Sequence, residues 1–142
     1  MPVDEDFLVP IGKADLKREG GDVTIISIAG ALPACLGAAD ILAKEGIAAD
    51  VVDLRTIVPM DKDAILKSVA KTGRVVIVDN SHRVGSVSSE VAAVISDKGF
   101  ESLKKPVRRL TAPPIHVPFN AGLEKALFPT KDKVAEAVRG LV

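Results

Sequence analysis

The stretch VTIISIAGALPACLGAADILAKEG, residues 23–46, contains the two patterns from which the fold is predicted. Its first seven residues form a nearly continuous β-branched run, which is typical of a parallel strand covered on both faces. From Leu32 to Ala43 the apolar residues follow helical spacing, while Pro33 suits a first helical turn and Gly46 a helix end. The stretch therefore predicts a buried strand followed directly by a helix.

The same alternation of patterns continues along the chain. ADVVDL (49–54) and VVIVD (75–79) are further buried-type strands, and PVRRLT (106–111) is predicted to be the last strand. The other predicted helices run from a cap at Asp61 to about Gly73, over SVSSEVAAVISDKG (86–99), over 121–127, and onward from a cap at Thr130. This order indicates a mostly parallel sheet with helices on both faces.

A charged segment near the N-terminus, ADLKREGGD (14–22), is predicted to be an edge strand that turns back through Gly20 and Gly21. Charges suit an edge because they discourage pairing with other chains. The expected fold is an α/β three-layer α/β/α sandwich. We expect residues 1–8 to be a linker remnant and residues 9–142 to form the domain.

Composition argues against several classes of function. The 142 residues are 47% hydrophobic and 27% charged, as in ordinary globular domains. The 19 basic and 19 acidic residues cancel, and Trp and Tyr are absent, so nothing favours binding to nucleic acid or to an anionic membrane. No apolar run reaches the ~20 residues that a membrane-spanning helix needs. The single cysteine, Cys35, cannot form an internal disulfide, which fits a reducing compartment.

The chain lacks the common catalytic and nucleotide-binding motifs. AGALPA, after the first buried strand, has one glycine where a dinucleotide site needs three, and GKA at 12–14 lacks the spacing of a phosphate-binding loop. No nucleophile elbow is present. His82 and His116, with one distant cysteine, do not make a metal cluster. Cys35 falls on the apolar face of its helix and is predicted to be a core residue.

Polar residues follow two of the buried strands, at the edge where open α/β sheets bind ligands. Asp53 and Arg55 are either a local ion pair or a charged hook for a carboxylate elsewhere. Asp79, His82 and Arg83 follow the third strand. The next helix begins with three serines, Ser86, Ser88 and Ser89, whose hydroxyls are expected to cap its free N–H groups.

Four stretches together resemble one family. They are VPIGKADLKREGGDVTIISIAG (9–30), DVVDLRTIVPMD (50–61), SVAKTGRVVIVD (68–79) and PVRRLTAPPIHVPFNAGLE (106–124). They resemble the C-terminal domain of transketolase-like enzymes, and within that group the beta subunit of thiamine-diphosphate-dependent 2-oxo acid dehydrogenases of the pyruvate, branched-chain and acetoin type. The chain departs from the family at GSVSSE (85–90), where a Gly-rich run is usual, and at PPIHVP (113–118).

The resemblance implies a mostly parallel five-stranded sheet with one antiparallel edge strand. It implies that thiamine diphosphate and magnesium serve the parent enzyme but are not bound by this segment, which lacks the family's G-D-G motif. The implied partners are the alpha subunit, a second beta subunit and the subunit-binding domain of the dihydrolipoyl acyltransferase core. The implied location is the bacterial cytoplasm or the mitochondrial matrix.

The expected function is therefore that of an assembly domain, inactive alone, within an oxidoreductase. No residue is expected to be catalytic, cofactor-binding or metal-binding. The interface candidates are Asp53, Arg55, Asp79, His82, Arg83, Phe119 and Glu124. The first helix is apolar nearly all round, so it lies either in the core or in an interface, and we expect the isolated chain to dimerise through it. A free-standing anion or small-molecule binding module, or the C-terminal domain of another transketolase-type enzyme, is the alternative.

Overall fold

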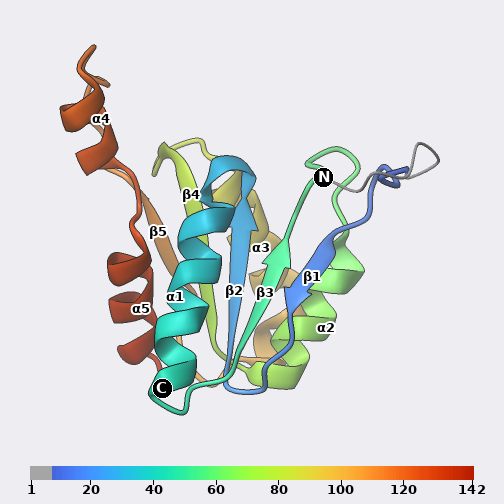
Figure 1. Ribbon diagram of the computed structural model, residues 1–142. Coiled ribbons are helices and arrows are strands. Elements are labelled where there is room, and N and C mark those ends of the chain that lie inside the picture. Colours follow the sequence, from blue (N-terminus) through green and yellow to red (C-terminus); the bar gives the residue numbers. More distant parts are fainter. Residues whose placement is uncertain (1–7) are drawn as a thin grey trace.

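The computed structural model describes residues 8–142, so the linker expected at 1–8 lies outside the described residues except for Leu8, which is exposed. Five strands form one sheet in the order β1-β3-β2-β4-β5 (Figure 1). They are β1 (Asp15–Arg18), β2 (Val23–Ile28), β3 (Ala49–Asp53), β4 (Val75–His82) and β5 (Arg108–Ala112). Strand β1 is antiparallel to β3, and the remaining pairs are parallel. The mixed sheet with an antiparallel edge strand is confirmed.

Helices cover both faces of this sheet. They are α1 (Leu32–Lys44), α2 (Lys62–Thr72), α3 (Val87–Gly99), α4 (Ala121–Leu127) and α5 (Lys131–Arg139), with short 3-10 turns η1 (Ala29–Ala31) and η2 (Phe100–Ser102). Helices α1 and α5 lie on one face, and α2 and α3 on the other (Figure 1). The three-layer prediction is confirmed.

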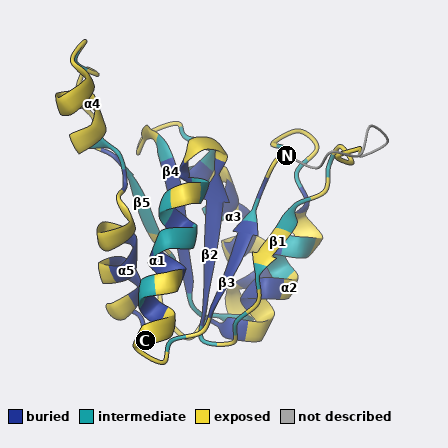
Figure 2. Ribbon diagram, in the orientation of Figure 1, coloured by how far each residue is buried: buried dark blue, intermediate teal, exposed yellow. Residues whose placement is uncertain are grey.

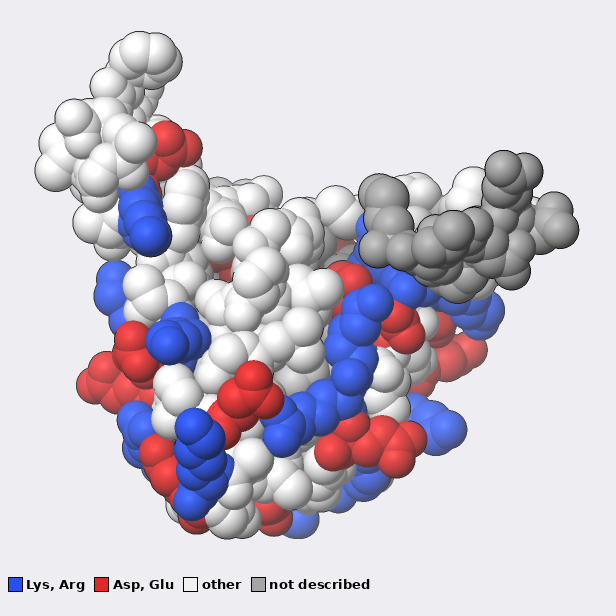
Figure 3. Space-filling view, in the orientation of Figure 1, with Lys and Arg blue, Asp and Glu red and all other residues white. Residues whose placement is uncertain are grey.

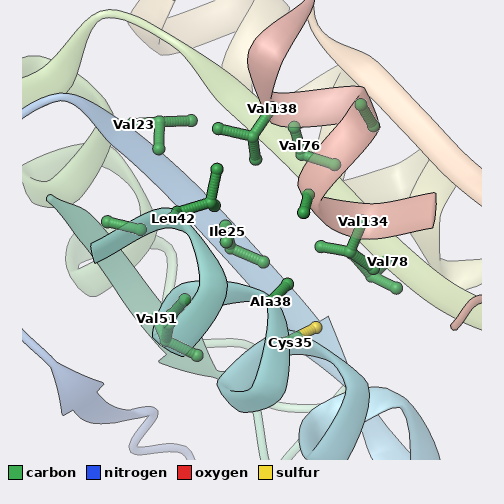
Figure 4. Close-up of a cluster of buried hydrophobic side chains, with 14 of the residues drawn as sticks. Val23, Ile25, Cys35, Ala38, Leu42, Val51, Val76, Val78, Val134 and Val138 are labelled. Atoms are coloured by element: carbon green, nitrogen blue, oxygen red, sulfur yellow. The ribbon is translucent and has the colours of Figure 1, made fainter. Parts of the chain in front are cut away.

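Alternation along the strands divides the core into two clusters. Successive side chains of a strand point to opposite faces, so Val23 and Ile25 pack under α1 and α5 while Ile26 and Ile28 pack under α2 and α3. All six residues of the central strand β2 are buried (Figure 2). Figure 4 shows the first cluster, in which strand valines meet the small and branched side chains of α1 and α5. A continuous apolar strand is needed because both of its faces are covered.

The predicted helix ends are confirmed where capping chemistry is clear. The Asp61 carboxylate accepts from the Ala64 N–H at 3.2 Å, and the Thr130 hydroxyl accepts from the Lys133 N–H at 3.3 Å. Helix α2 ends at Gly73, which has a left-handed backbone with φ of 72°. Glycine has no Cβ and enters this conformation without a steric cost.

Two expectations differ from the structure. Strand β4 continues to His82, beyond the apolar run that ends at Asp79, because the last strand pairs with it up to Ala112. Helix α1 shows no large exposed apolar side chain, since Cys35 and Leu42 are fully buried and its remaining large side chains contact the same cluster. Of the two alternatives for α1, the core is the observed one. The structure thus gives no support to dimerisation through this helix.

One segment leaves the body of the molecule. Between β5 and α5 the chain extends past the end of the sheet, forms α4 and returns (Figure 1). Helix α4 contains no buried residue. We call residues 113–129 the arm.

Candidate interaction surface

Exposed apolar side chains gather at the carboxyl end of the sheet. Of the thirteen large hydrophobic residues that are exposed within residues 8–142, ten lie on the arm, on the loops after β3 and β4, or on the segment before β1. They are Leu8, Val9, Ile11, Ile57, Val58, Val84, Ile115, Val117, Phe119 and Leu123. The segment before β1 belongs to this edge because the Gly12 N–H donates to the Thr56 hydroxyl at 3.1 Å. Such a concentration of apolar surface is typical of an interface.

The arm holds the most exposed of these side chains. Phe119 is 110% exposed, more than in an extended reference peptide, and Leu123 on α4 is 60% exposed. The space-filling view shows the arm as mostly uncharged surface standing clear of the body (Figure 3). Its local structure is nevertheless defined, because the Asn120 side chain accepts from the Gly122 and Leu123 N–H groups and caps α4. A capped helix without a core of its own needs another surface to bury its apolar side chains.

The strand exit after β3 differs from the predicted local ion pair. The Arg55 guanidinium binds the Asp15 carboxylate on β1, not Asp53. The Asp53 carboxylate is 3.4 Å from the Arg55 backbone nitrogen, from which it accepts. Arg55 has a positive φ of 54°, so the chain has left the strand before this residue and the period-two geometry does not apply. The interpretation of Asp53 and Arg55 as a local ion pair is therefore wrong. The Arg55 charge is already paired within this chain, with Asp15.

Asp15 is the centre of a small charge network. It accepts from Lys17 at 2.6 Å in addition to Arg55. The hydrogen bond from Lys17 lowers the pKa of the Asp15 carboxyl, and the nearby Arg55 charge adds to this effect against partial burial. The network joins β1 to the exit of β3.

The turn after β4 uses a carboxylate where serines were expected. Asp79 is 2% exposed, and its two oxygens accept from the Ser81 N–H at 2.9 Å and the Ser88 N–H at 3.3 Å. The Ser86 hydroxyl makes no cap and instead bonds the Ser88 hydroxyl at 2.5 Å. The serine-cap prediction is wrong, because the side-chain oxygens of Asp79 reach the free N–H groups from the adjacent strand. Ser89 donates to the Arg83 carbonyl at 3.4 Å.

The other predicted interface residues are spread around the same edge. His82 ends β4 and is exposed, and the Arg83 guanidinium donates to the Arg109 carbonyl at 3.4 Å. Asp53 is half-buried at the end of β3, while Glu124 is exposed in the first turn of α4. The structure brings these residues to one end of the sheet but does not join them in one cluster. Sequence reasoning missed the apolar residues Ile57 and Val58, whose position after a strand was the available signal.

Cys35 is a core residue, as expected. It is fully buried, and burial raises the pKa of its thiol to about 12, with a partial offset from the Ser27 hydroxyl and a small contribution from the Asp53 charge. A thiol with so high a pKa remains protonated and unreactive. Within residues 8–142 no group of three or more His, Cys, Asp or Glu side chains is arranged to hold a metal ion. No helix in that range is long and apolar enough to cross a membrane.

These features define an α/β domain with exposed apolar and polar side chains at the carboxyl end of its sheet. The chain belongs to the transketolase C-terminal domain family, which matches residues 12–134. Members of this family are domains of thiamine-diphosphate-dependent enzymes.

Several relatives are named as beta subunits. The 2-oxoisovalerate dehydrogenase subunit beta of Bacillus subtilis is 45% identical, with 99% of this chain and 43% of the relative covered. The acetoin:2,6-dichlorophenolindophenol oxidoreductase subunit beta of the same organism is 42% identical, covering 99% and 41%. The mitochondrial pyruvate dehydrogenase E1 component subunit beta of Dictyostelium discoideum is 37% identical, covering 96% and 38%.

A solved structure is also similar. It is described as a split gene transketolase, an inactive beta4 tetramer, and matches with a TM-score of 0.82 and 30% identity over 97% of this chain and 44% of that one. The fold prediction is thus confirmed by an independent structure. The chain spans less than half the length of each of these relatives.

Proposed function

We propose that this chain is the assembly domain of the beta subunit of a thiamine-diphosphate-dependent 2-oxo acid dehydrogenase. Its parent would oxidatively decarboxylate pyruvate or a related 2-oxo acid. The proposed partners are the alpha subunit, a second beta subunit and the subunit-binding domain of the dihydrolipoyl acyltransferase core. Relatives occur in bacteria and in mitochondria, which supports a bacterial cytoplasmic or mitochondrial matrix location.

The observation that carries the proposal is the apolar arm. Phe119 and Leu123 have no covering surface among the described residues, yet α4 is capped and held in a defined shape. Aromatic side chains that insert into a partner commonly supply the largest share of interface free energy. The arm therefore acts as a docking element, and the exposed loop residues Ile57, Val58 and Val84 extend the contact across the carboxyl edge.

The parent's cofactor would be held outside this chain. Thiamine diphosphate with magnesium supplies carbanion chemistry in such enzymes, and magnesium requires carboxylate and carbonyl ligands in near-octahedral geometry. The described residues offer no cluster of that kind, and we assign no step through the cofactor to them. The role of this chain is to place the neighbouring domains and to exclude water from their contact surface.

The polar candidates fall into two groups under this proposal. His82, Arg83, Glu124 and Asp53 are accessible or half-buried and line the rim of the interface. Asp79 acts indirectly, because both of its oxygens hold the turn that carries His82 and Arg83. Arg55 is bound to Asp15 in this chain and contributes to the interface by fixing the loop after β3.

The test compares two exposed phenylalanines. Phe119→Ala removes the arm's exposed phenylalanine, whereas the matched control Phe100→Ala removes one that is 71% exposed on η2, away from the arm. Each variant is combined with the separately produced remainder of the beta subunit and the alpha subunit, and assembly is followed by sedimentation. We expect Phe119→Ala to weaken assembly at least tenfold, since a central aromatic contact is worth about 2 kcal/mol or more. The control is expected to change it less than twofold.

Two results would contradict the proposal. One is equal assembly by the Phe119→Ala variant and the native chain, with unchanged unfolding midpoints. The other is decarboxylation of pyruvate or 2-oxoisovalerate by the isolated chain supplied with thiamine diphosphate and magnesium. Calorimetry with thiamine diphosphate, lipoate and phosphate tests the alternative of a free-standing binding module, for which tight binding by the isolated chain is required.

A further inference from the structure

A groove runs along the outer side of β5, away from the arm's apolar surface. Its volume is about 600 Å³, and consecutive residues from Lys105 to Leu110 form one wall while α5 forms another. A second depression of about 410 Å³ shares Arg83, Leu110 and Lys133 with it, so the two form one trough beside the strand. In the sequence, the basic run KKPVRR at 104–109 corresponds to this wall.

The wall of this groove that β5 forms is an open sheet edge. Strand β5 is last in the order and pairs only with β4 among the described strands. An edge strand presents unpaired backbone N–H and C=O groups in a row. An extended peptide can add to such an edge through main-chain hydrogen bonds, with side chains of alternate residues giving specificity.

The groove is strongly basic although the whole chain has no net charge. Its ionisable side chains are Arg83, Lys105, Arg108, Arg109, Lys133 and the single acid Glu136. None of the five basic side chains forms an ion pair with a carboxylate in the part of the chain that the structure describes. Such a concentration of one sign of charge in a concave site raises the local potential for a ligand of opposite charge.

Where these cations have partners, the partners are neutral. Arg109 donates to the Ser89 hydroxyl at 2.5 Å and to the Arg83 carbonyl at 3.2 Å. Lys133 donates to the Ala126 carbonyl at 3.4 Å. These bonds fix the positions of the cations without cancelling their charge. The groove is therefore preorganised for an anionic ligand.

Arg108 lines the groove beside the C-terminal end of α5. One of its guanidinium nitrogens lies 3.5 Å from the point where a Cβ on Gly140 would stand, at the C-terminus of α5. A helix C-terminus carries partial negative charge and favours a cation there.

We propose that the β5 groove binds an extended acidic peptide segment of a partner protein, which adds to the sheet as a sixth strand. An extended chain matches the row of open backbone groups, and its carboxylates match five basic side chains. A second copy of this chain is a poor occupant, because a twofold contact would place the same cations against one another. The proposal does not rest on the arm's exposed side chains, because Phe119 and Leu123 line neither part of the trough, although other residues of the arm line its second part.

The experiment uses the full chain and two capped heptapeptides, one alternating glutamate with valine and one alternating glutamine with valine. Affinity is measured by calorimetry at 50 mM and 300 mM salt, and amide protection by hydrogen exchange with NMR detection. We expect the glutamate peptide to bind at least tenfold more tightly at low salt, to lose most of that advantage at high salt, and to protect alternate amides of β5.

A pair of variants locates the site. Lys105→Gln combined with Arg108→Gln removes two exposed cations of the groove and is expected to weaken the glutamate peptide at least tenfold. Lys98→Gln, which removes an exposed lysine from the last turn of α3, is the control and is expected to have no effect. Unchanged unfolding midpoints exclude a folding defect.

Three results would overturn the proposal. They are equal affinity for the two peptides, binding that the groove variant does not weaken, and amide protection outside β5. Pyrophosphate displacing the peptide at equal concentration, with no β5 amide protected, would identify a small-anion site and would also overturn it.

Discussion

The two edge strands of the sheet, β1 and β5, differ in whether their basic side chains are paired with carboxylates. At the β1 edge each basic side chain of the strand has a carboxylate partner: Lys17 pairs with Asp15 at 2.6 Å and Arg18 with Asp40 at 2.7 Å. At the β5 edge Arg108 and its basic neighbours have none among the described residues, and a groove lies beside the strand. Exposed edges invite pairing with other chains. The β1 edge is neutralised within the chain, whereas the β5 edge keeps its charge for a partner.

The β1 edge is also anchored from beneath by a buried carboxylate. Asp50 on β3 is 1% exposed and accepts from the Gly20 N–H at 2.7 Å, the Ser68 hydroxyl at 2.6 Å and Lys71 at 2.6 Å. It thereby joins the turn after β1 to α2. Among the described residues, β5 itself contains no buried carboxylate. The comparison predicts that substitutions at the β1 edge lower the free energy of unfolding. Substitutions at the β5 edge are predicted to weaken peptide binding instead.

The largest expected effect comes from Asp50→Ala. The change leaves the Gly20 N–H without its acceptor, removes one of the two partners of the buried Ser68 hydroxyl and leaves Lys71 without its ion pair. A buried donor left unsatisfied costs about 1–3 kcal/mol. We expect the free energy of unfolding in urea to fall by about 3 kcal/mol. Asp40→Ala is the control, because Asp40 is 74% exposed and its pair with Arg18 is worth about 0–1 kcal/mol. Equal losses of stability in the two variants would show that the buried Asp50 contributes no more to folding than the exposed pair of Asp40.

The labelling rate of Cys35 provides a second measure of the stability that Asp50→Ala loses and the groove variant retains. Its buried thiol, with a pKa of about 12, should react with a thiol reagent at neutral pH only when the domain opens. Since labelling follows the population of open molecules, a loss of about 3 kcal/mol in Asp50→Ala should raise the rate on the order of 100-fold. The Lys105→Gln, Arg108→Gln variant should label at the native rate. Rapid labelling of the native chain would show that the thiol is accessible without opening.

Arg55→Ala tests how much the neutralised edge depends on its pairs. The Arg55 side chain is 22% exposed and its partner Asp15 is 32% exposed. Because Lys17 still pairs with Asp15 in the variant, we expect a loss of only about 0–1 kcal/mol in urea unfolding. A weakening of subunit assembly much beyond this loss would give Arg55 a direct contact with a partner. Equal, large losses of both would make it a structural residue of this domain.

The smallest effect concerns acid stability. The hydrogen bond from Lys17 lowers the pKa of Asp15 below its ordinary value of 3.8. A carboxyl with a lowered folded-state pKa stabilises the fold above its unfolded-state pKa, and this contribution is lost as pH falls through the folded-state value. The native chain should therefore lose more stability than Asp15→Asn between about pH 5 and pH 2, by less than about 1 kcal/mol because the pair is partly exposed. Parallel acid titrations of the two chains, followed by circular dichroism, would measure this difference.

How far the sequence predicted these features depends on the kind of interaction. Buried strands such as β2 were predictable because a continuous β-branched run is typical of a strand covered on both faces. The caps Asp61 and Thr130 were predictable because a cap bonds an N–H group only three residues away. The partner of Arg55 was not, since Asp15 is 40 residues away and meets it only through the β1–β3 pairing. The capping role of Asp79 was missed for a similar reason, because three nearby serines offered a simpler local solution.

The arrangement of α5 has a consequence for the order in which the nascent chain becomes protected. The layer formed by α2 and α3, against which Leu103 and Val107 also pack, is complete once residue 107 has been synthesised. The layer on the other face also needs Val134, Val138 and Leu141, which follow β5 and the arm in the sequence and pack against α1 and the strands. Until these residues leave the ribosome, one side of the sheet remains partly uncovered. Chaperones that bind apolar surface therefore have a window on this face that closes with the last helix, whereas the opposite face is sealed earlier.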